Sequence, residues 1–318
     1  MNLSLFSTLR GYRKEYLPKD IFSGIIIAAV SIPISMGYAQ ISGIPAIYGL
    51  YGSVFPILLF ALFSTSRQFI FGVDAAPAAI VGGALSTLGI AAESEAAMDY
   101  VPAIALFAGL WLFIFFLLHA DKIVDFISTP VMGGFISGIA VTIILMQIPK
   151  LMGSPAGSGE LLELAKHIFA AAKNISWLSL FMGLGALILI RLFKKLAPKF
   201  PMAIVIMALG VFSTVVFHVD EKGVVLLQSV ERGLPSLVIP DFGNVDLTQA
   251  AGRGLMVAVV IMAETLLAEN TFAFRNDYKL NDRQEILACA AGNIAAATVG
   301  CCPVNGSISR TSLNEQYG

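Results

Sequence analysis

The carboxyl group of Glu264 is the strongest candidate for chemistry in this sequence. It lies in the apolar run from Met256 to Leu267, about ten residues into a predicted membrane helix and, at about 1.5 Å of rise per residue, roughly 15 Å deep. A carboxylate near the bilayer midplane costs about 2.5–3.5 kcal/mol, so it must face a cavity, meet a partner or hold a proton. We interpret Glu264 as a proton-binding residue, with a structural hydrogen bond to a neighbouring helix as the alternative. Glu269 lies about 140° further around the helix and is expected to make a structural polar contact.

Arg310 marks a predicted anion site. The sequence from Asn305 to Ser312 is typical of a turn followed by a helix, with Ser307 as the N-cap and Arg310 at the third helical position. The start of a helix exposes unpaired N–H groups and carries about half a positive charge. The guanidinium adds a permanent charge, so we expect this helix start to bind an anion. An ion pair between Arg310 and a carboxylate such as Glu264 is the alternative, and the two states can alternate.

A second helix start is predicted at Asp74. This residue is typical of an N-cap, and Pro77 stands in the first turn that follows. Capping alone would explain the aspartate. The helix nevertheless presents another positive end, and two opposed helix starts near the midplane would hold a small anion between them. The predicted substrate site therefore includes Asp74 and the first helical residues, Ala75 and Ala76.

The other residues that often do chemistry form no catalytic or metal-binding motif. The three cysteines, Cys289, Cys301 and Cys302, have no His or Cys neighbours at metal-ligand spacing and are expected to be small buried apolar residues. The three histidines fall at predicted segment ends or in loops, where we expect a surface role, and they are His119, His167 and His218. The sequence contains no P-loop, no G-x-S-x-G and no H-E-x-x-H. We therefore expect no cofactor, no metal and no enzymatic activity, ATP hydrolysis included.

Membrane helices must position these residues, because the composition excludes a soluble chain. Hydrophobic residues make up 57% of the 318 residues and charged residues 13%, against about 25% charged residues in a globular domain. The mean hydropathy is +0.82. The net charge of −1 leaves no basic surface for nucleic acid. The sequence predicts an all-α polytopic membrane protein embedded in the lipid bilayer.

Apolar runs predict nine membrane segments and the start of a tenth. They cover residues 21–41, 46–63, 69–90, 101–119, 123–147, 176–193, 200–219, 254–274 and 284–300, and the tenth begins near 303. We expect a cytoplasmic N-terminal segment (1–20), a first seven-helix repeat (21–219), an extracytoplasmic loop (220–253) and the start of a second repeat (254–318). The predicted inside pieces hold 13 basic residues and the outside loops hold six. This bias predicts a cytoplasmic N-terminus in the cell inner (plasma) membrane.

Segments three and ten are interrupted in the same way. Each has a short extended piece, a Gly/Pro break and a helix start, within residues 72–77 and 303–307, and Pro33 interrupts segment one. Irregular backbone at membrane depth is tolerated only where protein or a water-filled cavity surrounds it. Interrupted segments at corresponding positions of two halves indicate the binding site of a transporter.

Three stretches resemble the sulfate permease (SulP) family of anion transporters. They are residues 20–24 with 32–39 and 43–51, then 64–68 with 72–76, and finally 264–271 with 278–280, 293 and 306–314. The resemblance implies fourteen membrane segments in two inverted repeats of seven, divided into a core and a gate. It places the substrate between the half-helices of segments three and ten, with Ser309 and Arg310 in the segment-ten site and Glu264 as the segment-eight acid. It also implies elevator-like motion, a homodimer and a cytoplasmic STAS domain, whereas this sequence stops inside segment ten.

Two positions depart from the family pattern. Ile34 stands where many members have a glutamine after the segment-one proline, which changes the substrate contacts. Ala268 stands four residues after Glu264, where sodium-coupled bicarbonate members have a threonine, so sodium would lose a hydroxyl ligand. We therefore expect proton-coupled secondary transport of sulfate, bicarbonate or a dicarboxylate. The alternatives are a nucleobase:cation symporter, against which Arg310 argues, a sodium-coupled bicarbonate transporter, and a membrane enzyme or scaffold.

Overall fold

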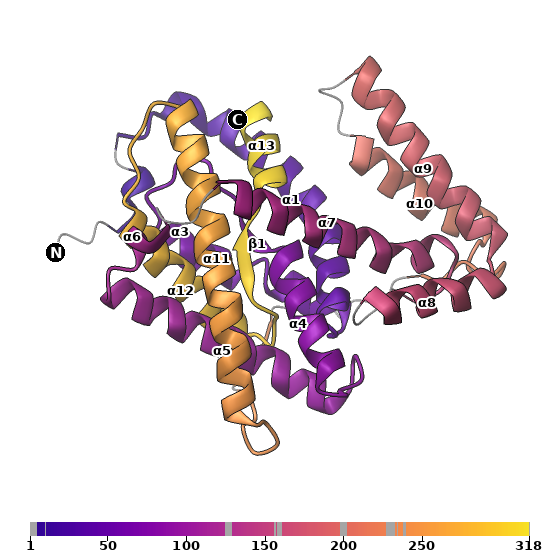
Figure 1. Cartoon of the computed structure of the whole chain (residues 1–318). Coiled ribbons are helices and arrows are strands. Elements are labelled where there is room, and N and C mark those ends of the chain that lie inside the picture. The colour runs from indigo at the N-terminus through magenta and orange to yellow at the C-terminus, as the bar shows by residue number, and fades with distance from the viewer. Residues whose placement is uncertain are drawn as a thin grey trace.

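The computed structural model describes residues 5–9, 11–124, 129–155, 157, 161–197, 202–226, 233, 235–237 and 240–317. Residues 1–4, the predicted start of segment seven at 200 and part of the predicted 220–253 loop lie outside the described residues. The described helices form two groups, which we call the body and the arm (Figure 1).

The body contains predicted segments one to four and eight to ten. Its helices pack around one buried apolar cluster, to which α5, α11 and α12 contribute Leu112, Ile261 and Ile286. After η1 (Ser7–Leu9) and η2 (Lys14–Tyr16), the body helices are α1 (Leu17–Ile41), α2 (Ala46–Tyr51), α3 (Phe55–Phe63), α4 (Ala75–Thr87), α5 (Glu95–Leu117), α6 (Asp121–Val124), α11 (Leu247–Arg275), α12 (Asp282–Thr298) and α13 (Ile308–Tyr317).

The arm contains predicted segments five to seven. Its helices are α7 (Thr129–Leu151), α8 (Leu161–Lys173), α9 (Trp177–Leu196) and α10 (Met202–Phe217). Figure 1 shows α9 and α10 beside the body, with α7 and α8 leading to them. The sequence predicted no helix at the position of α8, which lies in the connection between predicted segments five and six. Its apolar residues fall on one face, where Leu164 and Ala171 are buried.

Two short strands join the two halves of the chain. β1 (Phe71–Val73) pairs antiparallel with β2 (Val304–Gly306), with Gly72 opposite Asn305. The pairing satisfies backbone groups that water cannot reach at membrane depth. Each strand leads into a short helix, β1 into α4 and β2 into α13, so the predicted half-helices of segments three and ten are confirmed. The extended pieces were expected, but their pairing as a sheet was not.

Each half-helix packs against a helix from the other end of the chain. α4 contacts α11, and α13 contacts α1. Ser23 Oγ of α1 donates a hydrogen bond to Asn314 Oδ1 of α13 at 2.6 Å. Arg253 Nη2 of α11 donates to Thr87 Oγ1 at the end of α4 at 3.1 Å. Polar contacts between distant parts of the sequence therefore hold each half-helix in place.

Helix α11 begins inside the loop that the sequence predicted. Its first residue is Leu247, and Asp246 is its N-cap. The Asp246 carboxylate accepts hydrogen bonds from the backbone N–H of Thr248 at 2.9 Å and of Gln249 at 3.1 Å. This cap precedes the apolar run, so hydropathy alone placed the start too late. At 1.5 Å per residue, Glu264 is therefore about 26 Å from the start of α11, whereas the predicted depth of roughly 15 Å is counted from residue 254, where the apolar run begins.

Five stretches are long and apolar enough to cross a membrane. They are Lys14–Ile41, Ala46–Phe63, Glu95–Leu117, Trp177–Leu196 and Leu247–Arg275. Shorter apolar helices cover Ala75–Thr87, Ala140–Leu151 and Ile204–Phe217. Predicted segments three and ten do not cross as single helices, because a strand precedes a short helix in each.

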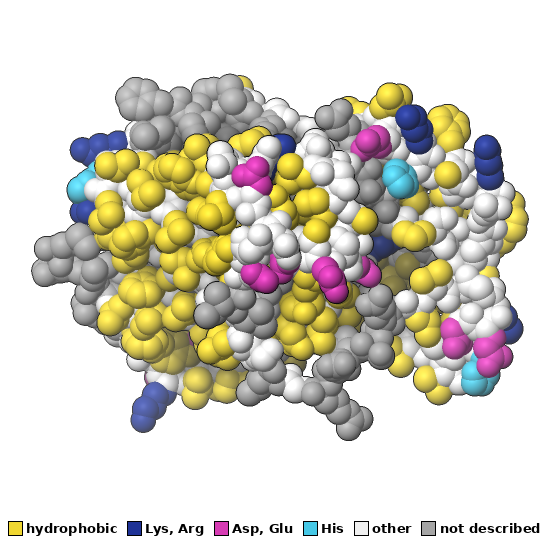
Figure 2. All heavy atoms as spheres, turned by 90° about the horizontal axis from the view of Figure 1, so that it is seen from below, with side chains coloured by type: hydrophobic (Ala, Val, Ile, Leu, Met, Phe, Trp, Pro, Cys, Tyr) yellow, Lys and Arg dark blue, Asp and Glu magenta, His cyan; other side chains and the backbone are white. Residues whose placement is uncertain are grey.

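Large apolar side chains lie on the outer surface of both groups. Leu58 of α3 is 61% exposed, Phe181 of α9 69% and Val215 of α10 67%. Figure 2 shows hydrophobic side chains across much of the face seen from below, with Lys and Arg mostly near its edges. Such a surface suits contact with lipid or with further membrane helices. The spans and this surface together indicate a multi-pass membrane protein.

The close packing of α4 on α1 can be tested at two adjacent glycines. A Cβ atom on Gly82 would collide with the carbonyl oxygen of Ile41, whereas one on Gly83 would meet no atom within 4 Å. We expect Gly82→Ala to lower the free energy of unfolding by about 1–3 kcal/mol, as overpacking does. Gly83→Ala is the matched control and should not destabilise. Thermal denaturation in detergent measures both, and equal melting temperatures would contradict the observed helix contact.

Candidate functional site

The β1–β2 pairing brings the starts of α4 and α13 to one place in the body. Asp74 follows β1 directly and occupies the N-cap position of α4, whose first turn contains Ala75 and Ala76. Ser307 follows β2 directly and precedes α13. Arg310 is the third residue of α13, as the sequence predicted. Residues far apart in the sequence therefore meet where two helices begin.

Asp74 pairs with Arg310 instead of capping its own helix. Its side chain makes no capping hydrogen bond. Its Oδ1 atom lies 3.8 Å from Arg310 Nη2 and accepts a hydrogen bond from Ser307 Oγ at 3.4 Å. Among the described residues, the carboxylate that pairs with Arg310 is thus that of Asp74 and not that of Glu264. The ion pair connects the two half-helices directly.

The guanidinium of Arg310 is buried and only partly satisfied. The residue is 1% exposed, and its Nη2 donates to the carbonyl oxygen of Val73 at 2.8 Å. Its Nε and Nη1 have no hydrogen-bond partner within the described part of the chain. Gly72 leaves room for the group, since a Cβ atom there would lie 3.1 Å from Nη1. Buried donors without partners are costly, so the site favours an added acceptor.

The two serines at the start of α13 differ in their exposure. Ser307 is 2% exposed, whereas Ser309 is exposed. Their hydroxyl oxygens lie 3.4 Å apart. Ser307 is thus a buried contact of Asp74, and Ser309 carries the exposed hydroxyl at this helix start.

Glu264 reaches the same strands through an asparagine. Asn305 Nδ2 of β2 donates to Glu264 Oε2 at 2.7 Å, and Asn305 Oδ1 accepts from Thr265 Oγ1 at 2.6 Å. Glu264 is half-buried, whereas Thr265 and Asn305 are fully buried. The structural hydrogen bond that was the alternative for Glu264 is therefore present. A carboxyl that accepts one such bond still has a free oxygen that can take a proton.

Three residues of this site were not predicted from the sequence. Thr265 and Asn305 carry the polar link from α11 to β2, and Tyr38 of α1 lies within electrostatic reach of Asp74, Arg310 and Glu264. Tyr38 belongs to the stretch 32–39 that carried the family resemblance. A polar residue inside an apolar segment was the available signal for Thr265 and Asn305.

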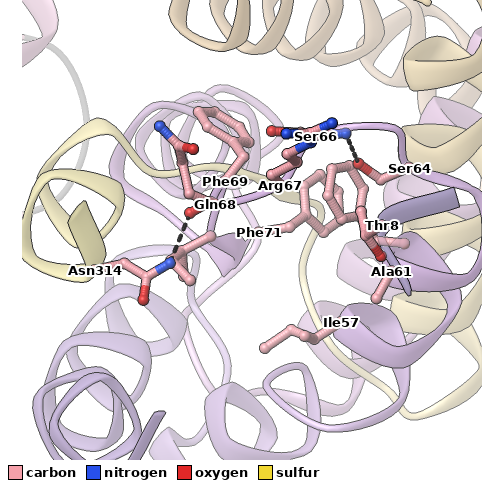
Figure 3. Close-up of a pocket in the computed structure, with 12 residues that line it drawn as sticks. Thr8, Ile57, Ala61, Ser64, Ser66, Arg67, Gln68, Phe69, Phe71 and Asn314 are labelled. Carbon is pink, nitrogen blue, oxygen red and sulfur yellow. Dashed lines mark hydrogen bonds between the residues drawn. The ribbon is translucent and has the colours of Figure 1, made fainter. Parts of the chain in front are cut away.

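A pocket of about 210 Å³ lies away from these residues. It is lined by residues of η1, α3, the 64–70 loop, β1 and α13, among them Ser64, Ser66, Arg67, Gln68 and Asn314. Figure 3 shows the backbone N–H of Ser66 bonded to the Ser64 hydroxyl and the Asn314 amide bonded to the Gln68 carbonyl. None of the predicted site residues lines this pocket.

Potential metal ligands are scattered among the described residues, which contain no group of three or more His, Cys, Asp or Glu able to hold a metal ion. The three cysteines are free and buried. Cys301 and Cys302 lie side by side, with their sulfur atoms 3.9 Å apart. At the starts of the two half-helices, the charged groups found among the described residues are Asp74 and Arg310, and Glu264 joins them through Asn305 of β2.

Comparison with known sequences matches this chain to one family profile and to proteins described as sulfate transporters. The profile of the sulfate permease family matches residues 17–318. A probable sulfate transporter of Mycobacterium tuberculosis is 26% identical over 309 residues, covering 97% of this chain and 55% of that protein. Sulfate transporter 4.1, chloroplastic, of Arabidopsis thaliana is 30% identical over 324 residues, covering 98% and 46%. The chain spans about half the length of these curated relatives.

Comparison with solved structures shows the fold. The transmembrane domain of the cyanobacterium bicarbonate transporter BicA matches with a TM-score of 0.81 at 20% identity, covering 96% of this chain and 79% of that one. The murine Solute Carrier 26 family member A9 anion transporter in its inward-facing state matches with a TM-score of 0.84 at 18% identity, covering 98% and 55%. The expected inverted-repeat membrane fold is thereby confirmed.

The Asp74–Arg310 pair can be tested by a double-mutant cycle. Asp74→Asn leaves a buried guanidinium without its counter-charge, so we expect the free energy of unfolding to fall by about 3 kcal/mol, the lower end of the range for breaking a buried pair. Arg310→Gln added to Asp74→Asn should cost less than the sum of the two single changes. Thermal denaturation of all four proteins measures the coupling.

The exposed pair Arg275–Glu315, with Nη1 and Oε2 3.0 Å apart, is the matched control. Its cycle should give a coupling of only about 0–1 kcal/mol, because exposed pairs contribute little. Additive effects at Asp74 and Arg310 would show that the buried pair does not hold the half-helices together.

Proposed function

This chain belongs to the sulfate permease family, and from that premise we propose that it forms the substrate-binding part of a secondary active transporter of small anions. The observation that carries the proposal is the Arg310 guanidinium, buried between two half-helix starts with two nitrogens lacking partners in the described residues. A permanent cation and two positive helix ends favour an anion over a neutral solute. The substrate class that we propose is sulfate, bicarbonate or a small dicarboxylate.

The anion would bind at the helix starts and not on Arg310 alone. Ser309 offers an exposed hydroxyl, and Ala75 and Ala76 belong to the first turn of α4. Arg310 is 1% exposed, so it acts on the anion mainly through its charge or after a local rearrangement. Asp74 then competes with the anion for the same cation.

Proton coupling follows from the two carboxyl groups beside the cation. When Asp74 and Glu264 are both ionised, their charges repel an incoming anion at close range. A proton bound at either carboxyl removes one repulsion, so anion and proton binding favour each other. Glu264 is the proposed coupling residue, because its free oxygen and its half-buried position give a proton access. Ala268 supplies no hydroxyl for sodium, which supports protons over sodium.

The body and the arm suit an elevator-type mechanism. We propose that the body is the core, which carries the anion site, and that α7 to α10 belong to the gate. The apolar outer surfaces of both groups would face lipid, the remaining membrane helices or a second subunit of a homodimer. We further propose a cytoplasmic N-terminus and a location in the cell inner (plasma) membrane, on the bias of basic residues described above.

The anion site is tested by uptake into liposomes with the protein purified at its full natural length. Arg310→Gln removes the charge, and we expect the affinity for the transported anion to fall at least tenfold, as loss of a charged hydrogen-bonding partner implies. Arg275→Gln removes a surface cation and should leave affinity unchanged. Unlabelled sulfate, bicarbonate, fumarate and uracil compete against one labelled anion. Inhibition by uracil alone would favour a nucleobase:cation symporter and overturn the anion proposal.

Proton coupling is tested by imposing gradients across the same liposomes. We expect Glu264→Gln to abolish uptake driven by a pH gradient while exchange of anions at equal pH persists. Glu315→Gln, a change at a surface carboxylate, is the control and should keep gradient-driven uptake. Full pH-driven uptake by the Glu264→Gln variant would exclude this residue as the proton site. Uptake driven by a sodium gradient instead would favour a sodium-coupled bicarbonate transporter.

A further inference from the structure

Two carboxyl groups outside the anion site are completely buried against each other. Glu269 of α11 and Glu285 of α12 are both 0% exposed. Helices α11 and α12 pack on each other, and each of the two carboxyl groups lies close enough to act on the charge of the other. Neither belongs to the site around Asp74 and Arg310, since Glu269 is five residues after Glu264 and lies about 140° around the helix from it.

Glu285 has donors for its negative charge, and Glu269 has none. Glu285 accepts hydrogen bonds from Ser64 Oγ at 2.8 Å, from the backbone N–H of Thr65 at 2.6 Å and from the Thr65 hydroxyl. Both oxygens of Glu269 are without a hydrogen-bond donor throughout the described chain. A buried carboxylate with no donor is among the most expensive groups in a protein. A proton on Glu269 would relieve this cost, because the carboxyl group then becomes a donor itself.

Among the described residues, the groups identified as acting on the pair are acidic or neutral. Asp282 adds a further negative charge, and Cys289 and Tyr278 lie close by. The Tyr278 hydroxyl is 3.2 Å from Ser66 Oγ. Arg67 is a cation of the same region, and its guanidinium lies over the Tyr278 ring at 5.4 Å. Arg275 of α11 pairs with Glu315, and Arg283 Nε of α12 donates to the carbonyl oxygen of Phe116. The ion pairs found among the described residues include neither glutamate.

We propose that Glu269 and Glu285 form a second proton site, in which one proton is shared between the two carboxyl groups. The protonated carboxyl of Glu269 donates to Glu285, which supplies the partner that the ionised form lacks. Two carboxylates in contact without a cation cannot both stay ionised, so one proton is held by the pair. The site is separate from the proposed coupling at Glu264.

A route for the proton leads through the pocket of Figure 3. Ser64 and Ser66 line that pocket, and the Ser64 hydroxyl is hydrogen-bonded to Glu285. Ser66 connects the same loop to Tyr278. Water in the pocket would therefore be two hydrogen bonds from the shared proton. The loop from 64 to 68 is predicted to be cytoplasmic, so the site would respond to the pH on that side.

Proton loss would loosen one end of α11. The pair joins α11 to α12, and through Ser64 and Thr65 it joins both helices to the loop before β1. Two adjacent negative charges would repel and separate these elements. The shared proton thus stabilises the packing of α11, the helix that carries Glu264, against α12 and the loop before β1.

The test measures the protonation of the pair and does not depend on transport. In the Glu264→Gln background, which removes the other proposed proton, we compare infrared spectra and melting temperatures across pH for the protein at its full natural length. We expect an infrared band of a protonated carboxyl group that disappears in Glu269→Gln. The sign of the pH effect follows from linkage: the folded protein holds a proton that the unfolded chain releases, so stability falls as pH rises above the ordinary glutamate range. If unfolding releases one such proton, the equilibrium constant of unfolding rises about tenfold for each unit of pH.

Glu269→Gln should fold normally, because its amide can donate to Glu285 in place of the proton. This variant should lose the one-proton pH dependence of stability while keeping its stability at low pH. Asp282→Asn, a change at the neighbouring partly exposed carboxylate, is the matched control and should keep both the band and the pH dependence. A band and slope unchanged by Glu269→Gln would overturn the proposal. Because Glu264 is absent from all these proteins, that result would leave the transport proposal untouched.

Discussion

The antiparallel pairing of β1 with β2 is the interaction on which the rest of this structure depends. Backbone at membrane depth must find its hydrogen bonds within the protein, and the two interrupted segments satisfy each other. Because the two strands run in opposite directions, the helices that follow them leave the pair in opposite directions. The register, with Gly72 opposite Asn305, then decides which side chains meet between the helix starts.

Buried and half-buried charged side chains of the body are compensated in three different ways. Asp74 and Arg310 form an ion pair, Glu264 accepts a hydrogen bond from Asn305, and Glu269 lies against Glu285. Within the described part of the chain, two nitrogens of Arg310 and both oxygens of Glu269 lack a hydrogen-bond partner, and Glu264 accepts the bond from Asn305 with one of its two oxygens. Groups that are incompletely satisfied in a dry interior are the ones that respond to a proton or an anion.

The sequence predicted the elements of the site better than their contacts. Arg310 at the third position of a helix, and Asp74 at the start of another, follow from local patterns of Gly, Pro and polar residues. That Asp74 turns from its own helix to Arg310 depends on a strand pairing across more than two hundred residues of sequence, which no local pattern contains. Helix ends outside the apolar runs, such as the start of α11 at Asp246, depend on caps that hydropathy does not register.

The pairing of the strands also places the proposed proton and anion sites close enough to affect each other. Asn305 holds Glu264 through its amide and faces Gly72 across the two strands. Arg310 Nη1 occupies the space beside Gly72 where a side chain would begin. A change in the charge of Glu264 alters the hydrogen bond from Asn305, and Asn305 lies opposite the glycine beside which the guanidinium lies. Two strands of three residues each therefore connect a carboxyl on α11 with a cation on α13.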